Sequence, residues 1–298
     1  MEKKQILQKL LFKYLDLSET LIQKDILMDD LLQYFSKIIE EFIKQNSREF
    51  EWSLVGGTML SKCFHNTYRL SEDIDITFFC SSKASSKNIM KDFLMFFKKK
   101  LYDDKLIDFN DSNISSKGLM RSYFNMQFTY KGYSYDFDLK SVIKNQKLKF
   151  EKKSILNIIS KNTESELSFS INTVELEYLI AEKMIAFERM SFDNIDDVRR
   201  TRHIYDIYSI FTNNLLSNNQ DTWKRIKDFF NWILKNIQHN KDKIKPFNEN
   251  IIFDTKKMSS EEIKTNIDEL IKRECYKEEK VRKIITWFND LKILIDCI

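Results

Sequence analysis

Helical periodicity of apolar residues dominates both ends of the chain. Between residues 19 and 45, for example, Ile26, Leu31, Phe35 and Ile38 are spaced by three to five positions, as on the buried face of an amphipathic helix. By the same criterion, the predicted helices span residues 5–16, 19–45, 58–64, 90–101, 173–190, 196–213, 222–238, 261–274 and 278–296.

Period-2 alternation of apolar and polar residues predicts strands in the part of the chain between these helices. The predicted strands span residues 50–55, 73–79, 122–130 and 133–143. The last two are separated only by Lys131 and Gly132, so they are expected to form a hairpin.

This order of elements predicts an α/β (α+β) fold in two domains. Residues 1–165 would hold a small mixed β-sheet flanked by helices, and residues 166–298 would form an α-helical C-terminal domain. We place the boundary in the region 150–172, where the composition changes and the pattern becomes entirely helical.

Composition supports a globular protein and sets few limits on its partners. Of 298 residues, 42% are hydrophobic, which is enough to build a substantial core. The net charge of +4 arises from 49 basic and 45 acidic residues, so a polyanionic partner is permitted without being required. The cysteines and histidines are scattered, which argues against a zinc site or a disulfide scaffold. No apolar run reaches the ~18 residues of a membrane span, and we expect a soluble cytoplasmic protein.

Two of the four glycines, Gly56 and Gly57, are adjacent. They lie between a predicted strand and a helix that Thr58 would open. Backbone N–H groups at such a helix N-terminus can bind phosphate oxygens. The sequence therefore predicts a phosphate-binding turn at this point.

Four aspartates on two predicted strands provide candidate metal ligands. Asp73 and Asp75 share one strand face, and Asp136 and Asp138 share a face of a later strand. Mg²⁺ is typically bound by carboxylates together with phosphate oxygens, and a pair of such ions can support in-line phosphoryl displacement. Three acids suffice for this chemistry, and spacing alone leaves Asp136 and Asp138 as rivals for the third position.

Three cations are candidates for contact with a triphosphate. Lys183 falls within the apolar stripe of the helix predicted over 173–190, where a lysine requires a partner for its ammonium. That partner is either a triphosphate or Asp206 on the next helix. Lys62 and Arg69 could bind phosphates, or they could simply balance the charge of the nearby aspartates.

Together these motifs resemble those of a known family. Residues 54–62, which contain Gly56-Gly57-Thr58, and residues 69–76, which contain Asp73-Ile74-Asp75, resemble the nucleotidyltransferase signature of the AbiEii/AbiGii abortive-infection toxins, in the DNA polymerase β-like superfamily. Residues 176–183 resemble that family's lysine motif, and residues 202–208 resemble its terminal Tyr-Asp motif, although His203 stands where an acidic residue is frequent.

The resemblance implies an activity and a set of partners. A nucleoside monophosphate would pass from an NTP to an acceptor, which in several relatives is the 3′ end of tRNA, with Mg²⁺ or Mn²⁺ as cofactor. The chain would be the toxin of a type IV toxin–antitoxin pair, with a cognate antitoxin encoded nearby. Two alternatives are an NTP-binding regulatory module without turnover and a nucleotidyltransferase that modifies a protein side chain.

The resemblance also assigns roles to individual residues. The implied catalytic residues are Asp73, Asp75, Asp138, Lys183 and Asp206, of which the first three would bind metal. The implied nucleotide-binding residues are Gly56, Gly57, Thr58, Lys62, Arg69, Ser71 and Lys183.

Overall fold

The computed structural model describes residues 19–46, 50–64, 70–71, 73–117, 123–156, 169–192 and 197–236. The described residues fall into two compact units that divide between Val174 and Glu175. The helices predicted over 5–16, 261–274 and 278–296, and the candidate residue Arg69, lie outside the described part of the chain.

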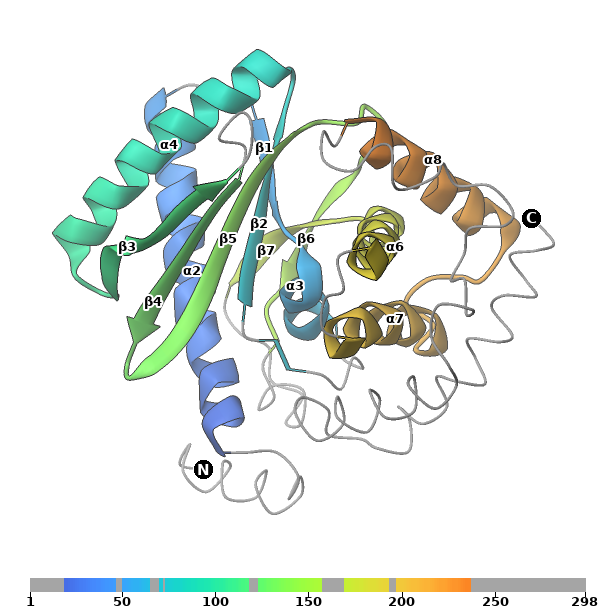
Figure 1. The fold of residues 1–298 in the computed structure, drawn as a ribbon, viewed down its shortest axis with the longest axis horizontal. Helices are drawn as coiled ribbons and strands as arrows, with labels where there is room; N and C mark the ends of the chain where they lie inside the picture. The colour runs from blue at the N-terminus through green and yellow to red at the C-terminus, as the bar shows by residue number, and fades with distance from the viewer. Residues whose placement is uncertain are drawn as a thin grey trace. The chain divides into compact units, whose positions relative to one another are not determined.

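A seven-stranded mixed sheet forms the first unit (Figure 1), which confirms the predicted α/β class. The strand order is β3-β4-β5-β2-β1-β7-β6. Two pairs, β2–β5 and β1–β7, are parallel, and the other neighbours are antiparallel. The strands are β1 (Phe50–Leu54), β2 (Asp73–Cys80), β3 (Asp108–Lys117), β4 (Tyr123–Tyr130), β5 (Tyr133–Ile143), β6 (Phe150–Ser154) and β7 (Ser170–Val174).

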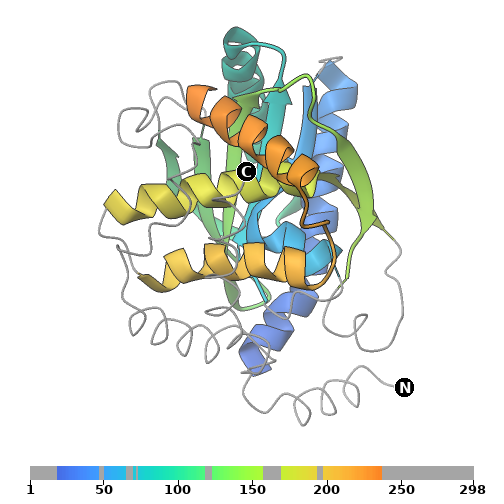
Figure 2. The same ribbon diagram turned by 90° about the vertical axis from the view of Figure 1, so that its right-hand side faces the viewer.

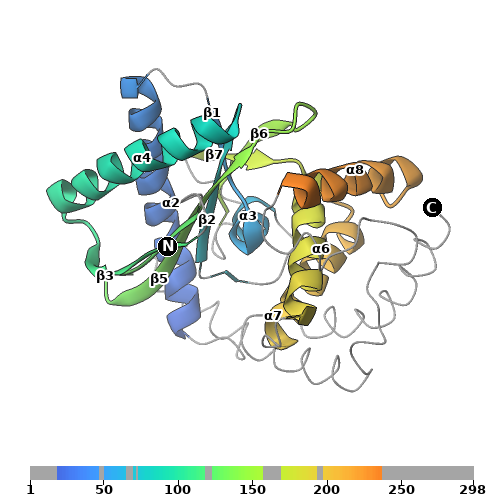
Figure 3. The ribbon, with the colours of Figure 1, turned by 45° about the horizontal axis from the view of Figure 1, so that its top comes forward.

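Helices α2 (Glu19–Asn46) and α4 (Lys83–Asp104) cover one face of this sheet (Figures 1 and 3). The layer between helices and sheet is rich in phenylalanine. Phe35 of α2 lies 4.7 Å from Phe137 of β5 between ring centroids, and Phe78 of β2 lies 4.9 Å from Phe93 of α4. Burying each such ring contributes roughly 1.5–3 kcal/mol, and period-2 alternation leaves the opposite face of each strand free for polar residues.

Helix α4 begins earlier than the apolar pattern predicted. The Ser/Lys-rich segment before Met90 is helical from Lys83 because the Ser82 side chain accepts a hydrogen bond from the Ser85 N–H at 3.1 Å. Such an N-cap satisfies a backbone donor that would otherwise be left without a partner in the first turn. The helix ends at Asp104, and the next residue, Lys105, adopts a left-handed conformation.

The predicted β-hairpin between β4 and β5 is confirmed. Lys131 and Gly132 form its two-residue turn, with φ values of 49° and 85°. Two consecutive positive φ angles are typical of the type I′ turn, whose twist matches that of the flanking strands.

Three helices make up the described part of the second unit (Figure 2): α6 (Leu176–Phe192), α7 (Asp197–Thr212) and α8 (Gln220–Asn236). Their core includes an edge-on contact of Tyr178 with Phe229 and a stacked contact of Phe211 with Trp223. The domain boundary predicted after residue 165 lies before β7. In the structure, β7 belongs to the sheet of the first unit, where it pairs with both β1 and β6. No helix among the described residues is long and apolar enough to cross a membrane.

Candidate active site

The register of two parallel strands brings the four candidate carboxylates together. In the β2–β5 ladder, Asp73 is paired with Asp136 and Asp75 is paired with Asp138. Neighbouring strands lie about 4.8 Å apart, and the intervening residue Phe137 is buried in the aromatic layer on the opposite face. All four aspartates therefore occupy one patch on the face that α2 and α4 leave uncovered.

Asp138 and Asp136 differ in their hydrogen bonds. The Asp138 Oδ1 accepts hydrogen bonds from the Tyr123 hydroxyl at 2.7 Å and from the Asn125 side-chain amide at 2.6 Å. Burial, the hydrogen bond to Asp138 and the charges of the neighbouring aspartates raise the pKa of Tyr123, so this hydroxyl keeps its proton and acts as a donor. The Asp136 Oδ1 is buried, and no described residue offers it a hydrogen bond.

This donor set fits a divalent cation by its chemistry. Carboxylate oxygens are the ligands that Mg²⁺ and Mn²⁺ prefer, and the β2–β5 register sets four carboxylates on one strand face. Within the described ranges, no three acidic, histidine or cysteine side chains already converge on a single point. The residues that could hold a cation are Asp73 and Asp75, together with Asp136 or Asp138.

The start of helix α3 (Gly56–Cys63) lies directly against one of these acids. Gly56 has a φ of 71°, and a Cβ atom placed on it would come within 2.0 Å of the Asp75 Oδ2. The adjacent Val55 N–H donates to the Asp75 carbonyl oxygen at 2.9 Å. Only glycine tolerates both the backbone conformation and this close approach. The glycine pair thus forms the first residues of the helix, and no side chain caps its N-terminus.

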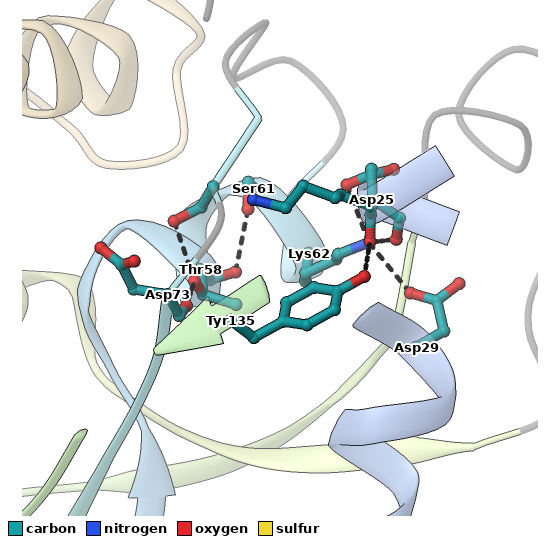
Figure 4. Close-up of polar contacts among 9 residues, drawn as sticks. Asp25, Asp29, Thr58, Ser61, Lys62, Asp73 and Tyr135 are labelled. Atoms are coloured by element: carbon teal, nitrogen blue, oxygen red, sulfur yellow. Dashed lines mark hydrogen bonds and ion pairs between the residues drawn. The ribbon is translucent and has the colours of Figure 1, made fainter. Parts of the chain in front are cut away.

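Thr58 connects α3 to the start of β2 (Figure 4). The Thr58 hydroxyl donates to the Asp73 carbonyl oxygen and lies 2.9 Å from the Ser71 hydroxyl. Both side chains are buried. In this structure the Thr58 hydroxyl therefore holds the backbone of Asp73 in place, and the Ser71 hydroxyl contacts Thr58.

Lys62, the second polar residue of α3 with a predicted ligand role, points toward α2 (Figure 4). Its side chain is fully buried, and its ammonium donates to the Asp25 carbonyl oxygen and lies 2.8 Å from the Asp25 carboxylate and 3.0 Å from the Asp29 carboxylate. Burial alone would lower the pKa of Lys62, but the charges of Asp25 and Asp29 outweigh that effect and raise it. The structure thus places Lys62 in a buried ionic cluster, and its predicted nucleotide contact stays a prediction.

Lys183 and Asp206 form an ion pair in the second unit. The Lys183 ammonium lies 2.5 Å from the Asp206 Oδ2, and the two residues are only 5% and 3% exposed. This is the internal pair that the sequence offered as the alternative to a triphosphate contact. The catalytic role predicted for both residues is not tested by this geometry.

Four residues of this region escaped the sequence-based analysis: Asp25, Asp29, Tyr123 and Asn125. Asp25 and Asp29 are four positions apart on the face of α2 that packs against the sheet, and acids within an apolar stripe were a signal available in the sequence. Tyr123 and Asn125 are two positions apart on β4 and lie on its less buried face. Only the β4–β5 register reveals that they reach Asp138.

Comparisons with known proteins identify relatives of this chain. Residues 37–281 match the family described as the nucleotidyl transferase AbiEii toxin of type IV toxin–antitoxin systems. The structure is similar to that of MenT4, a nucleotidyltransferase toxin of Mycobacterium tuberculosis H37Rv, with a TM-score of 0.51, 14% identity, and coverage of 98% of this chain and 94% of that one.

A second solved structure, an antigenic nucleotidyltransferase-like protein from Paracoccidioides brasiliensis, aligns with a TM-score of 0.33 and 12% identity over 87% of this chain and 90% of that one. No curated protein sequence matches.

Proposed function

Since this chain belongs to the AbiEii nucleotidyl transferase toxin family of type IV toxin–antitoxin systems, we propose that it transfers a nucleoside monophosphate from an NTP to the 3′ end of an RNA, specifically a tRNA. The consequence in the cytoplasm would be growth arrest, as in abortive infection, relieved by a cognate antitoxin. The observation that carries the proposal is the β2–β5 register, which sets four carboxylates side by side next to the N-terminus of α3.

The chain's own residues supply binding and orientation. The N–H groups of Gly56 and Gly57 donate to phosphate oxygens, as the uncapped start of a helix can. Asp73 and Asp75, with one aspartate of β5, would hold Mg²⁺ or Mn²⁺. When bound, such an ion neutralises the triphosphate and favours in-line displacement.

The transfer itself is a substitution at the α-phosphorus. The acceptor hydroxyl oxygen forms a new bond to this phosphorus, the bond to the bridging oxygen of the β-phosphate breaks, and pyrophosphate leaves with its electron pair. The hydroxyl proton passes to water, and Asp138 would help to activate the hydroxyl as one of the carboxylates that hold the ion. The family resemblance implies that Lys183 would stabilise charge on the leaving pyrophosphate and that Asp206 would orient its ammonium.

Label transfer from each of the four α-³²P-NTPs tests this function. The protein would be incubated with total RNA and Mg²⁺, with EDTA and the Asp75→Ala variant as controls. We expect one NTP to label RNA of tRNA size, and both controls to abolish the label. Label on protein instead of RNA would move the activity to protein acceptors, and an NTP that is bound and released unchanged would establish a regulatory module.

A further inference from the structure

The carboxylate of Asp138 is held by two side chains from the neighbouring strand. Asn125 of β4 is the direct register partner of Asp138, and Tyr123 is two positions further along the same strand and face. Both donate to the same oxygen, Oδ1, at 2.7 Å for the tyrosine hydroxyl and 2.6 Å for the asparagine amide. Hydrogen bonds to a charged acceptor are the stronger kind, so two of them fix the orientation of this carboxylate.

Asp136 has no such support, although it shares the strand and the face. Its register partner on β4 is Gln127, which is exposed. Its Oδ1 is buried and receives no hydrogen bond from any residue that the structure describes. Holding a carboxylate in one rotamer without donors costs conformational entropy and desolvation. The difference between the two aspartates therefore originates in β4.

The strand order determines what the orientation of Asp138 achieves. Strand β5 lies between β4 and β2, so the donors approach Asp138 from one side while Asp75, its register partner on β2, lies on the other. Because both donors bond to Oδ1, the other oxygen of Asp138, Oδ2, receives neither of these hydrogen bonds. This oxygen is therefore available to a ligand on the side of β2. A group that fixes a metal-binding carboxylate in this way typically matters nearly as much as the ligand itself.

We propose that Tyr123 and Asn125 are positioning residues that select Asp138, rather than Asp136, as the third carboxylate of the site and direct its Oδ2 toward Asp75. This assignment rests on the proposed function, because it names the residues that prepare that same site for a divalent cation. Tyr123 and Asn125 touch neither the nucleotide nor the acceptor; they act through Asp138.

The test removes the hydroxyl of one tyrosine on each face of β4, Tyr123 and Tyr130. Tyr123→Phe removes a donor to Asp138. Tyr130→Phe is the matched control, because its hydroxyl donates at 3.1 Å to Asp30, on α2. Two quantities are measured for each variant: Mn²⁺ affinity, by electron paramagnetic resonance with a non-hydrolysable NTP analogue, and kcat and KM for label transfer to RNA.

We expect Tyr123→Phe to weaken Mn²⁺ binding and to lower kcat by about tenfold or more, the scale for residues that orient metal ligands, with KM for the NTP nearly unchanged. Tyr130→Phe should alter neither quantity. Asn125→Ala removes the other donor and should weaken Mn²⁺ binding and kcat in the same way, so the proposal stays testable if one of the two variants folds poorly.

Direct replacement of the two aspartates completes the experiment. Asp138→Asn should abolish Mn²⁺ binding at the site, whereas Asp136→Asn should retain most of it. Wild-type Mn²⁺ affinity and kcat in both Tyr123→Phe and Asn125→Ala, or a loss confined to Asp136→Asn, would overturn the proposal. Because Mn²⁺ binding is measured without turnover, it decides the role of β4 even if RNA proves not to be the acceptor.

Discussion

Replacing Lys62 by methionine would separate a structural role of this residue from the nucleotide contact that the sequence predicted. Methionine keeps the approximate length and apolar stem of lysine but removes the charge. In the folded protein, the Asp25 and Asp29 carboxylates would then face one another across a fully buried site without the cation that lies 2.8 Å and 3.0 Å from them.

The expected loss of stability is large because the whole cluster is excluded from water. Lys62, Asp25 and Asp29 are 0%, 2% and 8% exposed. Removing one partner from a buried ion pair typically costs about 3–5 kcal/mol, since the remaining charges are left uncompensated. At roughly 2–4 °C per kcal/mol in domains of 150–250 residues, the melting temperature should fall by about 10 °C.

Thermal and urea denaturation of three proteins would test this magnitude. Lys62→Met should be strongly destabilised. The triple variant Lys62→Met/Asp25→Leu/Asp29→Leu should recover most of the loss, because replacing a buried ionic cluster by apolar residues of similar volume is often close to neutral. Lys100→Met is a matched control, since Lys100 pairs at 2.8 Å with Glu41 on the surface of the same unit, and it should change stability little.

Nucleotide affinity, measured by calorimetry below the melting transition, gives the refuting result. If Lys62→Met unfolded at the wild-type temperature but bound NTP much more weakly, the reasoning about the buried cluster would be wrong and the predicted nucleotide contact would be supported. If the triple variant failed to regain stability, the loss would stem from packing and not from unpaired carboxylates.

The same cluster predicts a pH dependence at the alkaline end. The pKa of Lys62 is raised above its ordinary value of 10.5 in the folded protein. The folded state therefore holds this proton more tightly than the unfolded chain does, so the stabilisation is fully present below pH 10.5 and is lost as the pH rises through the folded pKa. Unfolding free energies above pH 10 should fall more steeply for the wild type than for the triple variant.

Three further predictions follow from the described geometry. Gly56→Ala should lower the rate of transfer by about 10²-fold, because the added Cβ would displace the Asp75 carboxylate. The positive φ at this position also disfavours alanine by about 1–2 kcal/mol. Near wild-type kinetics would contradict the close approach of Gly56 to Asp75. Lys183→Met should lose both stability and about 10²-fold of transfer, and adding Asp206→Asn should restore the melting temperature but not transfer; recovery of both would make the pair purely structural. Burial raises the pKa of the Cys80 thiol to about 12, so this cysteine should resist iodoacetamide at pH 8 unless urea is added, as peptide mapping would reveal.

The sequence determined those parts of the fold that depend on local periodicity. The pattern correctly placed helix α2, strands β1, β2, β4 and β5, and the turn at Lys131 and Gly132. In an amphipathic helix or strand, the apolar residues repeat with the period of that element, so the sequence alone reveals it. Strands β3, β6 and β7 were missed. The segments Phe150–Ser154 and Ser170–Val174 are short and mostly polar, and they are strands because they pair with each other and with β1.

For the candidate site, the sequence alone indicated which residue types share a face, and tertiary structure decided their neighbours. Alternation placed Asp136 and Asp138 on one strand face and left them equivalent. Only the pairing of β5 with β4 gives Asp138 its two donors, whereas the Asp136 Oδ1 receives no hydrogen bond from the described part of the chain. Likewise, the sequence located Lys62 on the helix that follows the predicted glycine turn, but its partners lie 33 and 37 positions away on α2. Contacts between segments distant in the chain depend on register and packing, which the period of a single element does not encode.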